Sequence, residues 1–121
     1  MHAFHNHVQL VGRCGHEPEL KVLTDGTHLL QLRLYQDSRN EGYPPNSFRL
    51  KAWKGVARAM HRQIGRGDRL LVQGKLVNRS WEQLGQTVSR TEIHVSYFSV
   101  LANRGPHNEG RELPFSDLIT G

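Results

Sequence analysis

The sequence predicts an all-β fold, one small barrel of five short strands with a single short helix between the third and fourth strands. The chain has 121 residues, which suits one domain built around one core. Several short segments alternate between apolar and polar residues, as strands with one buried face do. Only residues 55–65 carry apolar side chains at helical spacing. These observations together predict an all-β barrel with one short helix.

The first part of the chain is predicted to be extended. Residues 8–11 form a short apolar run that ends near Gly12. Residues 17–23 are a second extended piece, because Pro18 disfavours helix in the residue before it. The Asp-Gly pair at residues 25–26 predicts a tight turn after this piece.

Two strictly alternating strands precede the helix. In residues 30–35, three Leu point one way, and the other face carries Gln31, Arg33 and Tyr35. In residues 48–53, one face carries Phe48, Leu50 and Ala52, and the other carries Arg49, Lys51 and Trp53. Residues 37–47 between them have turn composition and are expected to form a mobile hairpin loop.

The helix and two further strands complete the barrel. The helix is expected within residues 56–64 and to stop at Gly65. Residues 70–77 form the next strand, in which Gly74 marks a bend or bulge, and residues 91–97 form the last. Three strands, a short helix and two strands is the plan of an OB-fold barrel.

Composition separates a basic domain from a short tail. The chain carries a net charge of +5, which divides into +6 for residues 1–103 and −1 for residues 104–121. Alternation stops after Ala102, so residues 1–102 are expected to be the folded domain. Residues 103–121 are expected to be a flexible, slightly acidic tail. A basic domain attracts polyanions, and nucleic acid first among them.

The sequence also predicts where the protein works. It has no apolar run long enough to span a membrane, and its first residues do not resemble a secretory signal. Its single Cys14 has no partner for an internal disulfide and is expected to be a small buried side chain. We therefore expect a cytoplasmic protein, associated with the nucleoid if it binds DNA, with no membrane partner.

The outward side chains of residues 48–53 suggest a binding surface. If Phe48 and its neighbours fill the core, Trp53 must face outward beside Arg49 and Lys51. Unpaired bases stack on exposed indoles with little sequence preference, and cations meet the phosphates between them. The alternative is that Trp53 covers a subunit interface or lies under a loop.

Further outward groups repeat this combination of charge and aromatic surface. One set with a shared parity runs into the next hairpin: Lys75, Val77, Arg79 and Trp81. Trp81 could equally be a loop-packing aromatic. Arg33 and Tyr35 form a weaker pair. Tyr43, near Arg39 in the mobile loop, fits a turn slightly better than a contact with nucleic acid.

Metal binding and catalysis have less support. His2, His5 and His7 are close in sequence, but no Cys or carboxylate is spaced to complete a site with them. No nucleophile elbow, phosphate loop or carboxylate pair is present. We therefore expect no catalytic residues, no metal and no cofactor.

Several segments resemble bacterial single-stranded DNA-binding proteins. Residues 7–21 are similar to the N-terminal signature of that family: an apolar strand, Gly12, Arg13 as the variable residue, and then Glu17-Pro18-Glu19 before a basic residue. The similarity continues through further short segments: residues 25–26, 30–35, 48–53, 66–68, 72–76 and 78–81. Together it covers about residues 6–102.

The resemblance implies an OB-fold that assembles as a tetramer of paired dimers, with a dimer as the alternative. It implies sequence-tolerant wrapping of single strands in replication, recombination and repair. Family stacking aromatics correspond to Trp53 and Trp81. Family basic contacts correspond to Lys21, Arg49, Arg66 and Arg79. The expected nucleic-acid-binding set combines these residues with outward side chains of the strands and with Arg13: Trp53, Trp81, Arg49, Lys51, Arg79, Lys75, Arg33, Tyr35, Lys21, Arg66 and Arg13.

The chain departs from the family pattern at two places. Ser47 stands where the family often has Trp, which suggests fewer stacking positions. The tail holds Leu113, Pro114 and Phe115, similar to the family's partner-recruiting tip, but six residues follow and no acidic run precedes it. Recruitment of replication or repair proteins through this tail is therefore an open question.

Two other functions remain possible from the sequence. A dimeric primosomal relative of the family, which acts mainly through protein partners, also uses an OB-fold without such a tail. RNA binding is the other, because stacking does not by itself distinguish the sugars.

Overall fold

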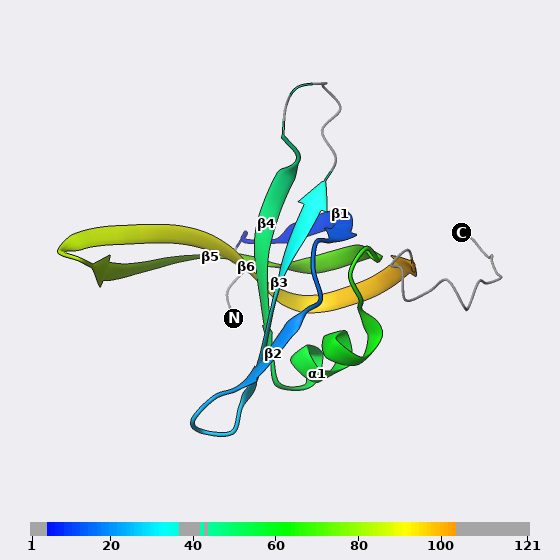
Figure 1. The fold of residues 1–121 in the computed structure, drawn as a ribbon, viewed down its shortest axis with the longest axis horizontal. Helices are drawn as coiled ribbons and strands as arrows, with labels where there is room; N and C mark the ends of the chain where they lie inside the picture. The colour runs from blue at the N-terminus through cyan, green and yellow to red at the C-terminus, as the bar shows by residue number, and fades with distance from the viewer. Residues whose placement is uncertain (1–4, 37–41, 43, 104–121) are drawn as a thin grey trace.

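The computed structural model describes residues 5–36, 42 and 44–103 (Figure 1). Its elements, in chain order, are β1 (Val8–Cys14), β2 (Glu19–Val22), β3 (His28–Gln36), β4 (Asn46–Trp53), α1 (Lys54–Gln63), β5 (Arg69–Gln83) and β6 (Gln86–Ala102).

The strands form one closed sheet. Their order is β1-β5-β6-β4-β3-β2, and an additional pairing between β1 and β3 closes a ring of five strands. All the pairings are antiparallel except that of β4 with β6. The predicted five-stranded OB-type barrel, with a short helix between its third and fourth strands, is confirmed.

The extended piece predicted at residues 17–23 is the short strand β2. It pairs with the part of β3 next to the part that β1 reaches: Cys14 lies opposite Leu34, and Glu19 opposite Gln31. β1 and β2 are thus two halves of one barrel strand, interrupted between Gly15 and Pro18. Proline has no N–H to donate to a ladder, which favours the interruption there.

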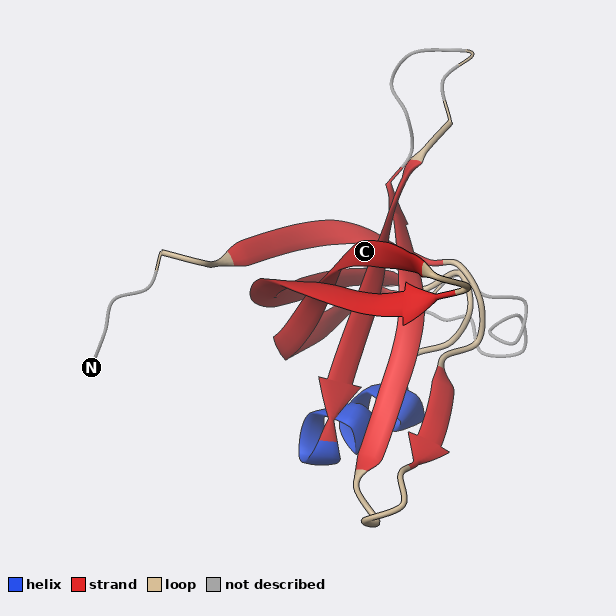
Figure 2. Cartoon of the chain, turned by 90° about the vertical axis from the view of Figure 1, so that its left-hand side faces the viewer, coloured by secondary structure: helices blue, strands red, loops and turns tan. Residues whose placement is uncertain are grey.

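The core follows the predicted alternation. Leu30, Leu32 and Leu34 of β3 are buried, as are two residues of β4, Leu50 and Ala52. Phe48 is half-buried against this cluster. The helix α1 covers one end of the barrel (Figures 1 and 2), where it buries Ala57 and Met60. It begins at Lys54, two residues before the predicted start, and the N–H of Ile64 donates to the Met60 carbonyl at its end.

The hairpin of β5 and β6 is longer than predicted. The expected strands at residues 70–77 and 91–97 extend to Gln83 and back from Gln86, and they project from the barrel as a ribbon (Figure 1). Side chains bridge this ribbon, for example Thr91 to Asn78 and Ser80 to Ser89. The predicted bulge is confirmed, because the register shifts between Gln73 and Gly74.

A buried carboxylate secures the turn between α1 and β5. Asp68 is fully buried and accepts hydrogen bonds from the Gly65 N–H at 2.8 Å and the Asn103 side-chain amide at 3.2 Å. The backbone carbonyl of Asp68 accepts a hydrogen bond from the N–H of Cys14. Burial raises the pKa of the Cys14 thiol to about 11, which fits the expected structural role of this residue.

Candidate nucleic-acid interface

Outward side chains of β3, β4, β6 and β5 form one continuous surface. Neighbours in register carry them across the sheet: Arg33 lies opposite Arg49, Lys51 beside His94, and His94 opposite Lys75. Further along the ribbon, Arg79 lies opposite Arg90. We call this surface the basic face and define it by Arg33, Arg49, Lys51, Trp53, Lys75, Arg79, Trp81, Arg90, Glu92 and His94. The two groups predicted separately from β4 and β5 therefore lie on the same side of the barrel.

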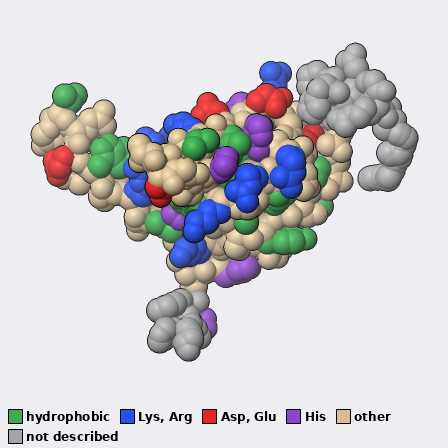
Figure 3. Space-filling model, turned by 90° about the horizontal axis from the view of Figure 1, so that it is seen from below, with side chains coloured by type: hydrophobic (Ala, Val, Ile, Leu, Met, Phe, Trp, Pro, Cys, Tyr) green, Lys and Arg blue, Asp and Glu red, His purple; other side chains and the backbone are tan. Residues whose placement is uncertain are grey.

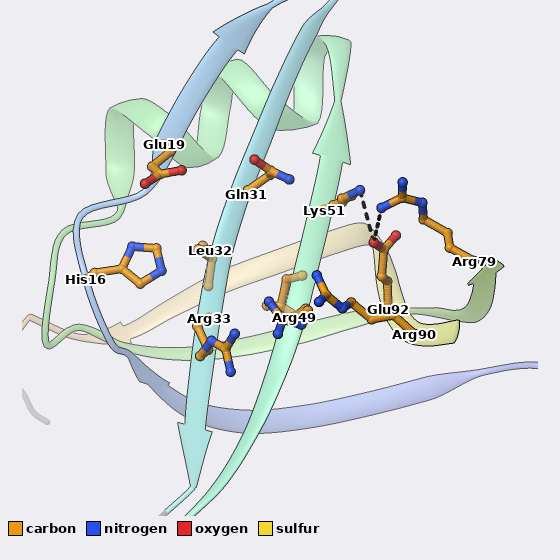
Figure 4. Close-up of a pocket in the computed structure, with 11 residues that line it drawn as sticks. His16, Glu19, Gln31, Leu32, Arg33, Arg49, Lys51, Arg79, Arg90 and Glu92 are labelled. Carbon is orange, nitrogen blue, oxygen red and sulfur yellow. Dashed lines mark hydrogen bonds and ion pairs between the residues drawn. The ribbon is translucent and has the colours of Figure 1, made fainter. Parts of the chain in front are cut away.

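A shallow open hollow of about 200 Å³ lies in the basic face (Figure 4). β3 and β4 contribute most of its lining, and side chains from the ribbon close one side. Its lining residues are His16, Glu19, Gln31, Leu32, Arg33, Arg49, Leu50, Lys51, Arg79, Arg90 and Glu92.

Three arginines form the most cationic part of this hollow. Burial lowers the pKa of Arg49, and the neighbouring charges of Arg33 and Arg90 lower it further. An Arg side chain nevertheless stays protonated in a protein. No salt bridge joins these three guanidinium groups to a carboxylate of the described residues; Arg33 donates to the Ser47 hydroxyl at 3.3 Å. Such a cluster favours a bound anion.

A buried carboxylate holds the neighbouring cations. Glu92 is 2% exposed, and its Oε2 lies 3.0 Å from Lys51 Nζ and 2.9 Å from Arg79 Nη1. Its Oε1 lies 3.2 Å from His94 Nε2. Burial raises the pKa of Glu92, but hydrogen bonds from Arg79, Lys51 and His94 outweigh that effect and hold the pKa at about 2. Glu92 is therefore ionised at neutral pH.

This arrangement corrects the expectation for Lys51. The sequence predicted an outward, solvent-facing cation, and the outward direction is right. The Lys51 side chain is only 13% exposed, however, because its ammonium group turns to Glu92. Parity within residues 91–97 separates Glu92 and His94 from the buried Ile93 and Val95, so alternation could have identified both as outward residues.

Neither tryptophan is sealed in the core. Trp53 is half-buried, and its ring meets that of His94 edge-on, with centroids 4.6 Å apart and an interplanar angle of 68°. Trp81 is half-buried beside two guanidinium groups, Arg79 at 4.9 Å and Arg90 at 5.2 Å from the ring centroid. The basic face thus carries both cationic and aromatic groups.

Other predicted residues lie around this face. Lys21 and Lys75 are exposed, and Lys21 lies opposite Leu29, which in turn lies opposite Trp53. Arg13 is half-buried opposite Tyr35, whose ring packs against Gly15.

Arg66 is exposed in the turn after α1, and its backbone N–H donates to Glu17. Helix α1 also exposes Lys54, Arg58 and Arg62. Lys and Arg side chains gather on the side of the molecule seen from below, where Figure 1 has α1 (Figure 3).

Some predictions fall on parts of the chain that the structure does not describe. These are Tyr43 and Arg39 of the loop, His2, and the tail with Leu113, Pro114 and Phe115. Among the described residues, no group of three or more His, Cys, Asp or Glu side chains is arranged to hold a metal ion. No helix in the same part of the chain is long and apolar enough to cross a membrane.

Comparison with known proteins gives a consistent result. Residues 5–101 match the model of the single-strand binding protein family. Single-stranded DNA-binding protein 1 of Nostoc sp. is 29% identical over 107 residues, which are 87% of this chain and 90% of that protein. The single-stranded DNA-binding protein of Thermus aquaticus is 29% identical over 113 residues, 90% of this chain but 42% of its own length.

A solved structure shares the fold. The Plasmodium falciparum SSB, in complex with ssDNA, matches with a TM-score of 0.71 at 26% identity. The match covers 86% of this chain and 99% of that one.

Proposed function

The chain belongs to the single-strand binding protein family, and on that premise we propose that it binds and protects single-stranded DNA with little sequence preference. It would act in DNA replication, recombination and repair. The observation that carries the proposal is the basic face, where two half-buried indoles share one surface with an arginine cluster that has no salt bridge to a described carboxylate.

Each part of the basic face has a role in the proposed complex. Bases stack on Trp53 and Trp81, and this stacking accepts any base because it needs no sequence-specific hydrogen bond. Phosphates meet the guanidinium groups of Arg33, Arg49 and Arg90 in the hollow, where no salt bridge holds these side chains back. A duplex would not fill these positions as well, because its bases are already stacked on one another. The preference for single strands thus follows from the aromatic positions rather than from charge.

The remaining predicted residues belong to the periphery of the proposed site. Lys21, Lys75, Arg13 and Arg66 add positive charge along the path of the strand, and Tyr35 offers a further aromatic ring that is partly covered by Gly15. Arg79 joins the two parts of the basic face, because its guanidinium group lies over Trp81 and the side chain also lines the hollow.

We further propose a non-enzymatic, cytoplasmic, self-associating protein. Tyr97 and Leu101 of β6 are 53% and 44% exposed, and contact with another copy of the chain would cover these apolar side chains. A tetramer of paired dimers is the assembly we expect. Residues 1–102 would form the DNA-binding domain, and residues 103–121 a tail that could recruit repair proteins through Leu113, Pro114 and Phe115.

Titration with oligo(dT) tests the proposal directly. Because both Trp residues of the chain belong to the basic face, stacking bases should quench their emission strongly at low salt, with a smaller effect from duplex DNA of equal length. Measuring the mass of the complex in parallel gives the oligomeric state. Unchanged emission together with no change in mass would overturn the proposal. Competition with RNA of matching sequence separates DNA from RNA binding.

A further inference from the structure

Glu92 occupies an unexpected place for an acidic residue. It lies in the lining of the hollow, at the centre of a surface that otherwise favours anions. It is 2% exposed, forms salt bridges with Lys51 and Arg79, and is hydrogen-bonded to the His94 ring. Figure 4 shows its carboxylate between Lys51 and Arg79, on the same side of β4 as Arg49 and Arg90.

The contacts of Glu92 are those that a phosphate group would make. Two cations from different strands, Lys51 of β4 and Arg79 of β5, converge on one oxygen at 3.0 and 2.9 Å. Charge-assisted hydrogen bonds to an anionic oxygen have this geometry whether the oxygen belongs to a carboxylate or a phosphate. Of the five cationic side chains that line the hollow, these two are already neutralised in part, and the three arginines are not.

We propose that Glu92 is an internal competitor for the DNA phosphate, which withholds Lys51 and Arg79 from the bound strand. The inference rests on the proposed function. It implies that the protein binds single-stranded DNA less tightly, and with a weaker dependence on salt, than it would if all five cationic side chains of the hollow met phosphates.

The substitution Glu92→Gln separates this role from a structural one. It keeps the side-chain shape and removes the charge, so the proposal predicts tighter binding to oligo(dT). Each phosphate contact to a single strand adds about −0.7 to the slope of log affinity against log salt concentration. Counted from 1 M salt, each cation released from Glu92 should therefore raise the affinity roughly fivefold at 0.1 M salt. Damage to the site would instead weaken binding. Glu82→Gln is the matched control, since it removes the same charge from the exposed ribbon, and should change affinity far less.

The outcomes are distinct. Tighter binding with a steeper salt slope in Glu92→Gln alone supports the proposal. Equal or weaker binding by a folded Glu92→Gln overturns it, while the unaltered protein still binds. An equal gain in Glu82→Gln also overturns it, because the effect would then come from net charge. Absence of binding by the unaltered protein would reject the proposed function instead.

A second variant answers the question if Glu92→Gln does not fold. Lys51→Met leaves Glu92 with two partners, Arg79 and His94. If the Glu92 carboxylate withholds Lys51 from DNA, Lys51→Met should reduce affinity much less than Arg49→Met does, since Arg49 makes no such pair. Equal losses in affinity and salt slope for the two variants would show that Lys51 meets phosphate unhindered, and would overturn the proposal.

Discussion

The guanidinium group of Arg79 lies over the ring of Trp81, 4.9 Å from its centroid, while its Nη1 also binds Glu92 at 2.9 Å. One side chain, Arg79, thus contacts both Trp81 and the carboxylate of Glu92 that lines the hollow. Arg90, directly opposite Arg79 on β6, lies 5.2 Å from the same ring. Trp81 therefore lies in the ribbon against two guanidinium groups rather than packing under a loop.

Replacing either tryptophan by Ala should weaken binding of oligo(dT) by about 1–3 kcal/mol, because each variant loses one stacking position. Fluorescence titration of each variant should show quenching only from the remaining indole. Circular dichroism controls for folding, particularly for Trp53, which packs on His94. Full affinity in Trp53→Ala would favour the alternative that this ring covers a subunit interface.

Removing Arg49 should reduce the salt dependence of binding. Because Arg49 belongs to the cluster without a carboxylate partner among the described residues, Arg49→Met should make the log–log salt slope less negative by about 0.7. The measurement is a series of titrations at several salt concentrations around 0.1 M, where the Debye length is about 10 Å. Arg58→Met, on the exposed side of α1, is the control with equal loss of charge. Identical slopes for both variants would argue that only net charge matters.

The alternation of apolar and polar residues within each β-strand was enough to predict the inner and outer faces of β3 and β4. Burying Leu50 and Ala52 forces Arg49 and Trp53 outward, and this argument needs only local sequence. It cannot identify the partner of Lys51, because β4 meets β6 through a pairing between residues far apart in the chain. Parity shows that Glu92 points outward, but only the register shows which cations it meets.

The length of the ribbon was missed for a different reason. Beyond Val77, β5 and β6 leave the barrel core, so most of their side chains are exposed or half-buried on both faces. Apolar alternation, which identifies strands through a buried face, is weak there. The ribbon is held by backbone pairing and by polar contacts such as that between Thr91 and Asn78.

Stability should decline in acid through Glu92. Its pKa is about 2 in the folded protein against an ordinary value of 4.5, so its contribution is fully present above pH 4.5 and is lost as pH falls toward 2. The depression corresponds to a contribution on the order of 3 kcal/mol. Urea unfolding at several pH values should show a steeper loss of unfolding free energy between pH 4.5 and 2 for the unaltered protein than for Glu92→Gln. Parallel curves would mean that another carboxylate dominates.

The turn at the tip of the ribbon can be improved by a single substitution. Gln83 pairs with Gln86, so the hairpin closes through two residues, and both have positive φ: 52° at Leu84 and 79° at Gly85. Such a type I′ turn favours Asn-Gly, whereas Leu seldom adopts this conformation. Leu84 is also 96% exposed, so its side chain contributes no packing that would be lost. Leu84→Asn should therefore raise the unfolding free energy by roughly 0.5–1 kcal/mol, measured by urea denaturation, while oligo(dT) affinity stays the same. A fall in affinity without a fall in stability would show instead that this apolar side chain contacts the bound strand.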